Sequence, residues 1–177
     1  RVCHERTAIL ARLLHAVIAT HRVPEQHMSI EQLEDIAQAL VAEGKGIIAI
    51  DESTNTIKRR FEAVGIENTE EHRRAYREML LTTPRLGEHI SGAILFDETL
   101  RQSTKDGVPF AQVMREAGIL PGIKVDKGTQ SLAGFPGELV TEGLDGLRER
   151  LKEYARLGAT FAKWRAVITI GSETPSG

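Results

Sequence analysis

The chain has 177 residues, of which 41% are hydrophobic and 27% are charged, and its formal net charge is −2. This length suits one domain with a good core, and the near balance of charge gives no reason to expect nucleic acid or a membrane surface as a partner. The single cysteine, Cys3, excludes an internal disulfide framework and fits a reducing, cytoplasmic compartment.

Residues 1–28 differ in composition from the rest and are predicted to be an N-terminal extension. They hold the cysteine and most of the histidines but no glycine, and Met28 followed by Ser29 resembles a natural chain start. We expect this extension to be non-native or poorly ordered, the alternative being a genuine helix that packs on the domain. The histidines form no pair at metal-ligand spacing, so we expect no metal site. No apolar run approaches the roughly 20 residues of a membrane span.

From Ser29 onward, helices and strands are predicted to alternate. Ser29 can cap an amphipathic helix that ends at Gly44, and Thr69 can cap a helix that runs to about Leu81. The predicted helices cover residues 29–43, 54–64, 69–81, 109–117 and 143–157. The predicted strands cover residues 46–51, 90–96, 121–125 and 159–168. A long polar loop that holds at most a short strand is expected over residues 127–142.

This order of strands and helices is typical of parallel pairing through right-handed crossovers. Two architectures fit it, a doubly wound sheet and part of a (β/α)8 barrel. A dinucleotide-binding sheet needs a glycine-rich turn after its first strand, but Asp51-Glu52-Ser53-Thr54 stands there instead. We therefore predict an α/β fold of the TIM-barrel type, of which about the first four βα units are present, over residues 29–177.

Three predicted strands carry an ionisable residue, namely Asp51, Lys124 and Lys163. Burying an unpaired charge is costly, so these residues are candidates for an active site. Asp51 falls at the carboxyl end of its strand, where barrels place their chemistry, whereas Lys124 and Lys163 are expected to lie further inside theirs. The alternatives are a helix cap at Asp51 and a solvated strand end at Lys124 beside Asp126. Lys163 lies in an apolar run and is harder to explain by structure alone.

Two lysines and an aspartate suggest amine chemistry. A lysine desolvated beside another ammonium can act as a nucleophile or proton shuttle near neutral pH, and an aspartate can hold it or take a proton from a substrate hydroxyl. Excess positive charge at a barrel mouth also suits a phosphorylated substrate. Arginines on helices are more commonly exposed surface residues. The residues that can contribute to phosphate binding are Ser53, Thr56, Arg59, Arg60, Arg73, Arg74 and Arg165.

Seven strings with consistent separations stand out across about residues 29–177: GKGIIAIDEST, IENTEEHRRAYREML, GAILFDETL, PGIKVDKG, LAGFPGE, GLDGLRERL and FAKWRAVITIG. In the same order, they resemble class I fructose-1,6-bisphosphate aldolases. The resemblance implies a (β/α)8 barrel and a glycolytic lyase. Such an enzyme cleaves fructose 1,6-bisphosphate to dihydroxyacetone phosphate and glyceraldehyde 3-phosphate through a lysine Schiff base. It needs no cofactor, and full-length members are expected to form homo-oligomers.

The resemblance also implies roles for individual residues. Asp51 matches the family aspartate that contacts the Schiff-base lysine and the substrate hydroxyls. Lys124 matches a substrate-binding lysine, and Lys163 matches the lysine that assists proton transfers as the carbinolamine forms and dehydrates. Further positions that match substrate-binding or neighbouring pocket residues are Ser53, Thr56, Arg60, Arg73 and Arg165.

In the family, the Schiff-base lysine, the catalytic glutamate and further phosphate-binding residues follow the region that these strings match. We therefore expect a fragment of an aldolase that carries helper residues, and a half-barrel that is catalytically silent by itself. A less favoured alternative is another Schiff-base aldolase in which Lys163 is the nucleophile. A full barrel typically needs about 250 residues, and four strands leave an open sheet with an unpaired edge.

Overall fold

A computed structural model describes residues 29–176, so the predicted extension over residues 1–28 lies outside the described residues. The chain divides into two units, Arg1–Leu33 and Glu34–Gly177, and the sheets belong to the second. The strands are β1 (Gly46–Ile50), β2 (Ile90–Leu95), β3 (Leu120–Lys124), β4 (Thr129–Ser131), β5 (Leu139–Thr141) and β6 (Phe161–Lys163). The helices are α2 (Ile30–Leu40), α3 (Thr54–Glu62), α4 (Glu70–Leu81), α5 (Leu86–His89), α6 (Asp97–Arg101), α7 (Phe110–Glu116) and α8 (Leu147–Arg156).

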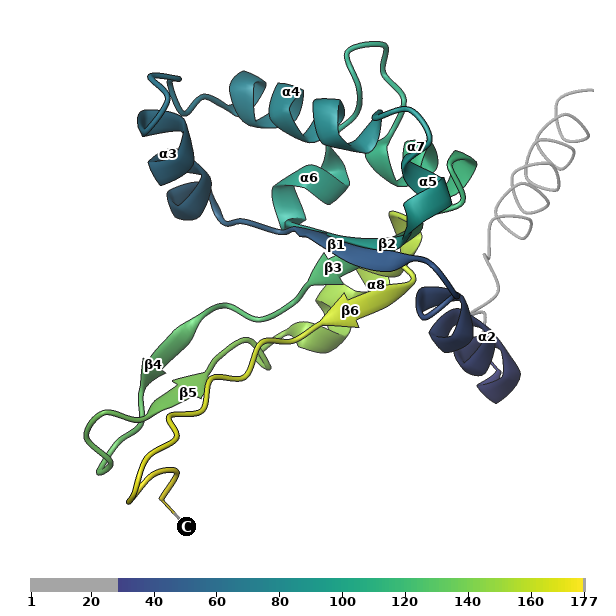
Figure 1. Ribbon diagram of the computed structural model, residues 1–177. Helices are drawn as coiled ribbons and strands as arrows, with labels where there is room; N and C mark the ends of the chain where they lie inside the picture. Colours follow the sequence, from purple (N-terminus) through teal and green to yellow (C-terminus); the bar gives the residue numbers. More distant parts are fainter. Residues whose placement is uncertain (1–28, 177) are drawn as a thin grey trace, which may run out of the picture. The chain divides into compact units, whose positions relative to one another are not determined.

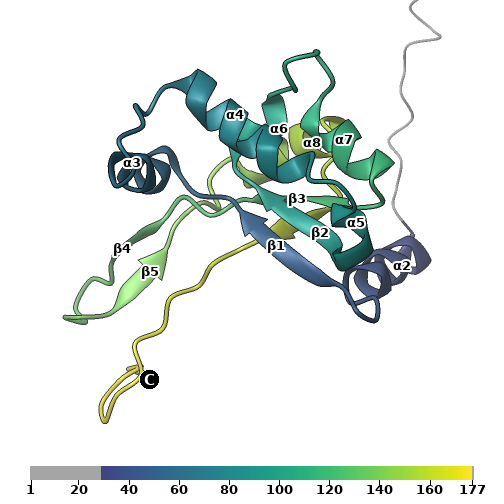
Figure 2. The same cartoon turned by 45° about the horizontal axis from the view of Figure 1, so that its top comes forward.

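Within residues 29–176, four parallel strands form the main sheet in the order β1-β2-β3-β6. Each of the three pairings joins a parallel strand to the next one along the chain, as in the wall of a β/α barrel. Figure 1 and Figure 2 show α4, α5, α6 and α7 over the same face of this sheet. The prediction of an α/β fold with a parallel sheet is confirmed. The described strands form an open sheet, with β1 and β6 at its edges, and no closed barrel.

The hydrophobic core lies between that sheet and its helices. Phe110 and Met114 of α7 are fully buried in it, together with Leu81 of α4 and Tyr154 of α8. Burying a large apolar side chain stabilises a fold by about 1.5–3 kcal/mol. The helix-covered face of the sheet therefore supplies the stability, and the opposite face is available for polar residues.

Residues in register across the sheet form layers that alternate between its two faces. Ile50, Leu95 and Ile123 share one level and are no more than 3% exposed, on the face that the helices cover. Side chains alternate along a strand, so the next residue of each strand points to the other face. The layer that follows on this other face consists of Asp51, Phe96, Lys124 and Lys163.

Two helix starts are confirmed at the level of single hydrogen bonds. Thr69 caps α4, because its hydroxyl accepts a hydrogen bond from the backbone N–H of His72 at 3.1 Å. Ser29 likewise accepts one from the N–H of Gln32 at 3.2 Å. Each hydroxyl satisfies a donor that the first turn of a helix leaves without a partner.

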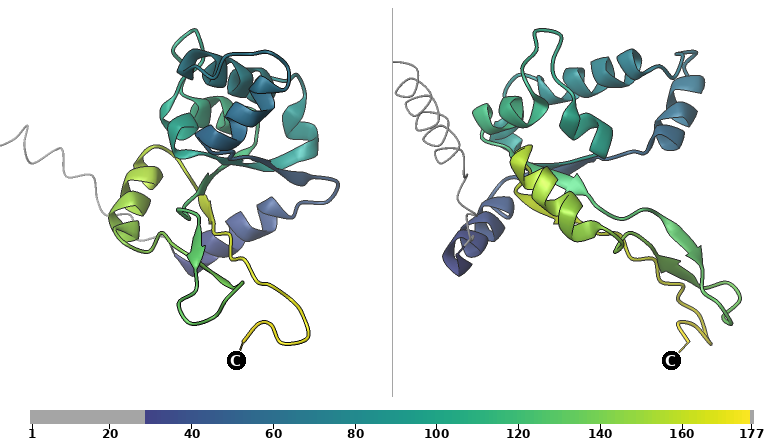
Figure 3. Two further views of the ribbon diagram at one scale, coloured as in Figure 1. Left: turned by 90° about the vertical axis from the view of Figure 1, so that its left-hand side faces the viewer. Right: turned by 180° about the vertical axis from the view of Figure 1, so that it is seen from behind.

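The strand predicted for residues 159–168 was wrong in extent, since β6 covers only Phe161–Lys163. A strand needs a neighbour to share its ladder of hydrogen bonds, and none of the described strands lies on the outer side of β6. Beyond β6 the chain runs beside the β4–β5 hairpin (Figure 3), where Thr141 donates a hydrogen bond to the Arg165 carbonyl at 2.9 Å. The segment over residues 127–142, predicted to be a long polar loop, contains the antiparallel β4–β5 hairpin.

The helix predicted from residue 143 was also wrong in extent, because α8 begins at Leu147. Gly143 and Gly146 have φ angles of 129° and 66°, which lie outside the helical region and are readily adopted by glycine. The short helices α5 and α6 were not predicted. Each has at most five residues, too few for a helical pattern in the sequence.

Phe161 lies on the inner face of the sheet, which is the face opposite the covering helices, and its ring packs where β2 and β3 carry glycine. A Cβ atom at Gly122, in register with Phe161, would overlap the aromatic ring. We expect Gly122→Ala to lower the free energy of unfolding by about 1–3 kcal/mol through overpacking, measured by urea denaturation followed by circular dichroism. The control is Gly46→Ala on β1, where an added Cβ meets nothing within 4 Å. Equal stability of Gly122→Ala and the parent chain would contradict the prediction.

Candidate active site

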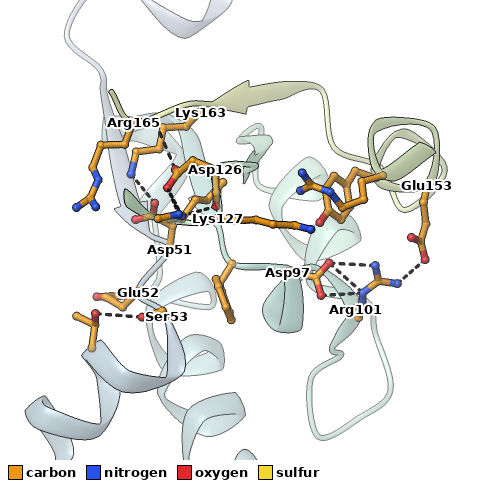
Figure 4. A pocket seen from close by; sticks show the side chains of 16 residues that line it. Asp51, Glu52, Ser53, Asp97, Arg101, Asp126, Lys127, Glu153, Lys163 and Arg165 are labelled. Carbon is orange, nitrogen blue, oxygen red and sulfur yellow. Dashed lines mark hydrogen bonds and ion pairs between the residues drawn. The ribbon is translucent and has the colours of Figure 1, made fainter. Parts of the chain in front are cut away.

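An ion pair joins the two edge strands of the sheet. Lys163 Nζ, at the end of β6, donates a hydrogen bond to Oδ2 of Asp51, directly after β1, at 2.7 Å (Figure 4). Neighbouring strands lie about 4.8 Å apart, so the two edges of a flat four-stranded sheet would be about 14 Å apart. Side chains that stand upright on a flat sheet would not meet over that distance. The ion pair therefore requires a sheet that curves toward its inner face, as a barrel wall does.

A second ion pair lies at the end of β3. Lys124 Nζ donates to Oδ1 of Asp126 at 2.6 Å and to the Asp126 carbonyl at 2.7 Å. The buried Asp126 carboxylate also accepts hydrogen bonds from the backbone N–H groups of Gly128 and Arg165. Burial by itself raises the pKa of Asp126, but Lys124 and the two N–H groups outweigh burial and lower that pKa below its ordinary value. Asp126 thus ties the end of β3 to the segment after β6.

All three predicted charged residues lie at the carboxyl ends of strands. Lys124 and Lys163 are in register as the last residues of β3 and β6, so the prediction that they lie further inside was wrong. The hydrogen-bond ladder of each strand simply ends there. Ser53, not Asp51, is the N-cap of α3, which removes the alternative that Asp51 caps this helix. The side chains of Asp51, Lys124 and Lys163 are 12%, 17% and 29% exposed, so each is partly desolvated and has an oppositely charged partner.

A cavity of about 830 Å³ opens at these strand ends, within the usual range for a small-molecule pocket. The lining carries six positive and five negative side chains, an excess of one positive charge; the cations are Arg101, Lys124, Lys127, Arg150, Lys163 and Arg165, and the carboxylates are Asp51, Glu52, Asp97, Asp126 and Glu153. This excess of cations favours an anionic ligand. Six of the eight predicted site residues line the cavity: Asp51, Ser53, Thr56, Lys124, Lys163 and Arg165.

Two hydroxyl groups face the cavity at the start of α3. The Ser53 and Thr56 hydroxyl oxygens lie 3.2 Å apart. The N-terminus of a helix attracts anions through its exposed N–H groups and its dipole. Ser53 and Thr56 are therefore suitably placed to contact a phosphate.

The other two predicted residues, Arg60 and Arg73, do not line the cavity. Arg60 forms an ion pair with Glu52, and its side chain is 56% exposed. Arg73 makes two hydrogen bonds to Glu98, at 2.8 and 2.7 Å, which raise the pKa of Arg73 above its ordinary value. The structure gives both guanidinium groups a carboxylate partner within the chain, and their contact with substrate stays a prediction.

The far wall of the cavity carries an ion-pair network between α6 and α8 (Figure 4). Arg101 donates to Glu153 at 2.5 Å and to Asp97 at 3.0 Å. The hydrogen bond to Glu153, followed by that to Asp97, raises the pKa of Arg101. The network fixes these two helices against each other at the edge of the cavity.

Among residues 29–176, no three His, Cys, Asp or Glu side chains lie together as metal ligands would. None of the helices described there is long and apolar enough to cross a membrane. The charged groups at the strand ends are amines and carboxylates, which can exchange protons with a bound substrate.

A family match covers most of the chain. Residues 32–177 match the family described as "Glycolytic: Fructose-bisphosphate aldolase class-I". The chain belongs to the class I fructose-bisphosphate aldolase family. This match confirms the resemblance drawn from the seven sequence strings.

Individual relatives agree with the family match. The chain is 76% identical over 150 residues to a probable fructose-bisphosphate aldolase class 1 of Xanthomonas campestris pv. campestris, covering 85% of this chain and 45% of the relative. It is 53% identical over 163 residues to fructose-bisphosphate aldolase 4, cytosolic, of Arabidopsis thaliana, covering 91% and 41%. The chain therefore spans less than half the length of these relatives.

A solved structure is similar as well. It is a ternary complex of fructose-bisphosphate aldolase from Plasmodium falciparum with TRAP and a small-molecule inhibitor. The TM-score is 0.79 at 52% sequence identity, and the match covers 82% of this chain and 42% of that one. The open parallel sheet is thus similar to part of a known aldolase fold.

Several residues at the site were missed by sequence reasoning. A signal for Asp126 was available, because it follows Lys124 by two positions and residues two apart share one side of an extended chain. Phe96 lines the cavity but reads in the sequence as the end of an apolar strand. Arg77 is 2% exposed beneath the Asp51 loop, yet nothing in the sequence distinguishes it from the other arginines of α4.

Proposed function

We propose that this chain forms one wall of the active site of a class I fructose-bisphosphate aldolase. This glycolytic lyase cleaves fructose 1,6-bisphosphate to dihydroxyacetone phosphate and glyceraldehyde 3-phosphate through a lysine Schiff base. The observation that carries the proposal is the Asp51–Lys163 ion pair, with Lys124 in the same layer of the sheet. The Schiff-base lysine is proposed to come from the part of the aldolase that follows the matched region.

The ion pair suggests how protons move. Asp51 is proposed to hold the Schiff-base lysine and to exchange a proton with a substrate hydroxyl. Lys163 is proposed to pass protons during carbinolamine formation and dehydration, and the Asp51 carboxylate at 2.7 Å can receive or return them. Lys124, fixed by Asp126, is proposed to bind the substrate through its ammonium group.

The sugar phosphates are proposed to bind at two positions. Ser53 and Thr56 receive one of them at the start of α3, and Arg165 contributes from the segment after β6. Arg60 is exposed enough to turn from Glu52 toward the second phosphate. For Arg73, whose guanidinium is bonded to Glu98, the proposal rests on the resemblance alone.

The setting of the enzyme follows from the family. We propose a cytoplasmic location. The Arabidopsis thaliana relative is named a cytosolic aldolase. We also propose that the whole aldolase is a homo-oligomer without a cofactor. These proposals rest on the family and on no contact within the described residues.

A chimera tests the proposed function. It joins residues 29–177 of this chain to the remainder of the Xanthomonas campestris relative, which is 76% identical over the shared region. We expect the chimera to cleave fructose 1,6-bisphosphate in a coupled assay. We expect borohydride reduction with dihydroxyacetone phosphate to trap an adduct on a lysine of the added part. The 177-residue chain alone is expected to show neither cleavage nor an adduct.

Two outcomes would contradict the proposal. A chimera with a native circular dichroism spectrum and no cleavage would show that this chain does not supply an aldolase wall. An adduct on Lys163 would identify it as the nucleophile, which is the alternative Schiff-base chemistry. Mass spectrometry of the reduced peptides distinguishes an adduct on Lys163 from one on Lys124 or on the added part.

A further inference from the structure

A buried arginine of α4 lies beneath the loop that carries Asp51. Arg77 is 2% exposed, whereas Arg73 and Arg74 on the same helix are only half-buried. Burying a guanidinium is costly unless nearby groups compensate for its lost water. Burial lowers the pKa of Arg77 against the opposing attraction of Glu52. The surroundings of Arg77 therefore have to supply oriented acceptors.

Those acceptors come from the loop between β1 and α3 and from α6. Arg77 Nη2 donates to the backbone carbonyl of Glu52 at 3.0 Å, and Nη1 forms an ion pair with Glu52 Oε2 at 2.7 Å that lacks hydrogen-bond geometry. Arg77 Nε donates to the Thr99 hydroxyl of α6 at 3.3 Å. The loop consists only of Asp51, Glu52 and Ser53, so fixing both the backbone and the carboxylate of Glu52 restrains its two neighbours.

We propose that Arg77 is a positioning residue for Asp51: by clamping Glu52 from below, it holds the Asp51 carboxylate against Lys163. Arg77 does not line the cavity, so it acts through Glu52 and touches no substrate. The inference deepens the proposed function and rests on it, because a proton-transferring pair has to be held in its productive geometry. Arg60, which pairs with Glu52 from the exposed side, is too solvated to replace this clamp.

Lysine labelling of the purified 177-residue chain tests the inference. Trace acetylation with acetic anhydride, read by mass spectrometry, gives a relative rate for each lysine. In Arg77→Met we expect the acetylation rate of Lys163 to rise about threefold, because Asp51 no longer holds the Lys163 amine in an ion pair. This size corresponds to the loss of a partly exposed ion pair. Lys124, bonded to Asp126, and the exposed Lys152 are expected to keep their parental rates.

Two further variants set the scale and the background. Asp51→Asn gives the rate of Lys163 without its carboxylate partner. Arg74→Met is the matched control, because Arg74 pairs with Glu78 on the same helix. This variant is expected to leave the acetylation rate of Lys163 unchanged.

An unchanged Lys163 rate in Arg77→Met would overturn the inference. So would a joint rise of Lys163 and Lys124, because it would show a general loosening of the fold. If Arg77→Met lacks the parental circular dichroism spectrum, Arg77→Lys is judged by the same two outcomes, since lysine keeps the charge but not the planar fork. The assay contains no substrate, so its result does not depend on whether the chimera cleaves fructose 1,6-bisphosphate.

Discussion

Replacing Lys163 with methionine is expected to lower kcat of the chimera for fructose 1,6-bisphosphate cleavage by about 10²–10⁴-fold, the usual contribution of a positioned acid or base. Methionine keeps much of the bulk of the side chain but cannot carry a proton. Lys163 is half-buried and hydrogen-bonded to Asp51 at 2.7 Å, so a solvent-exposed group cannot take over its proton transfers. KM is expected to change far less, because the loss falls on a proton transfer and not on substrate binding.

The partner of Lys163 provides a check on this prediction. Asp51→Asn removes the charge with little change in size and is expected to lower kcat to a similar extent. Because the two groups act as a unit, the double variant is expected to lose much less than the product of the two single losses. Lys152→Met, at an exposed site on α8, is the control and is expected to retain parental kcat. A Lys163→Met variant that retains more than about a tenth of kcat would argue against the assigned role.

The second large effect is expected at Asp126, in the stability of the 177-residue chain. Asp126→Asn is expected to lower the free energy of unfolding at pH 7 by about 2–4 kcal/mol, because it removes one partner of a largely buried ion pair. The loss is smaller than for a fully buried pair because the Lys124 side chain is 17% exposed and can turn toward water. Urea denaturation followed by circular dichroism measures it, with the exposed Asp106→Asn as the control.

The same variant has a defined pH dependence. The pKa of Asp126 is lowered in the folded chain, so the folded state keeps this carboxylate ionised more readily than the unfolded state does. Its contribution to stability is fully present above the ordinary aspartate pKa of about 3.9 and is lost as the pH falls below it. We therefore expect the difference in stability between the parent chain and Asp126→Asn to be constant from pH 7 to about pH 5 and to shrink toward pH 3. A difference that grows on acidification would have the wrong sign.

Local features of the fold could be read from the sequence. Thr69 was placed at the start of its helix because a hydroxyl before a run of acidic residues is a short-range signal. The strands β1, β2 and β3 were found within about a residue of their bounds, since their apolar runs are bounded by glycine or proline or by polar residues. β6 was overestimated because its apolar run is longer than its ladder, and a ladder depends on a neighbouring strand.

The sequence by itself determined which predicted strands carry a charged residue, namely Asp51, Lys124 and Lys163, and its strings determined the family. Only the tertiary structure decided how these charges are paired. Lys163 meets Asp51 across 112 positions of sequence because the sheet curves and brings its two edges together. Tertiary packing likewise sets which arginine of α4 is buried, since the burial of Arg77 depends on the loop that carries Glu52 and on α6, and not on its neighbours in the sequence. Short-range signals fix local conformation, whereas the site is made by contacts that form only when distant segments fold onto one sheet.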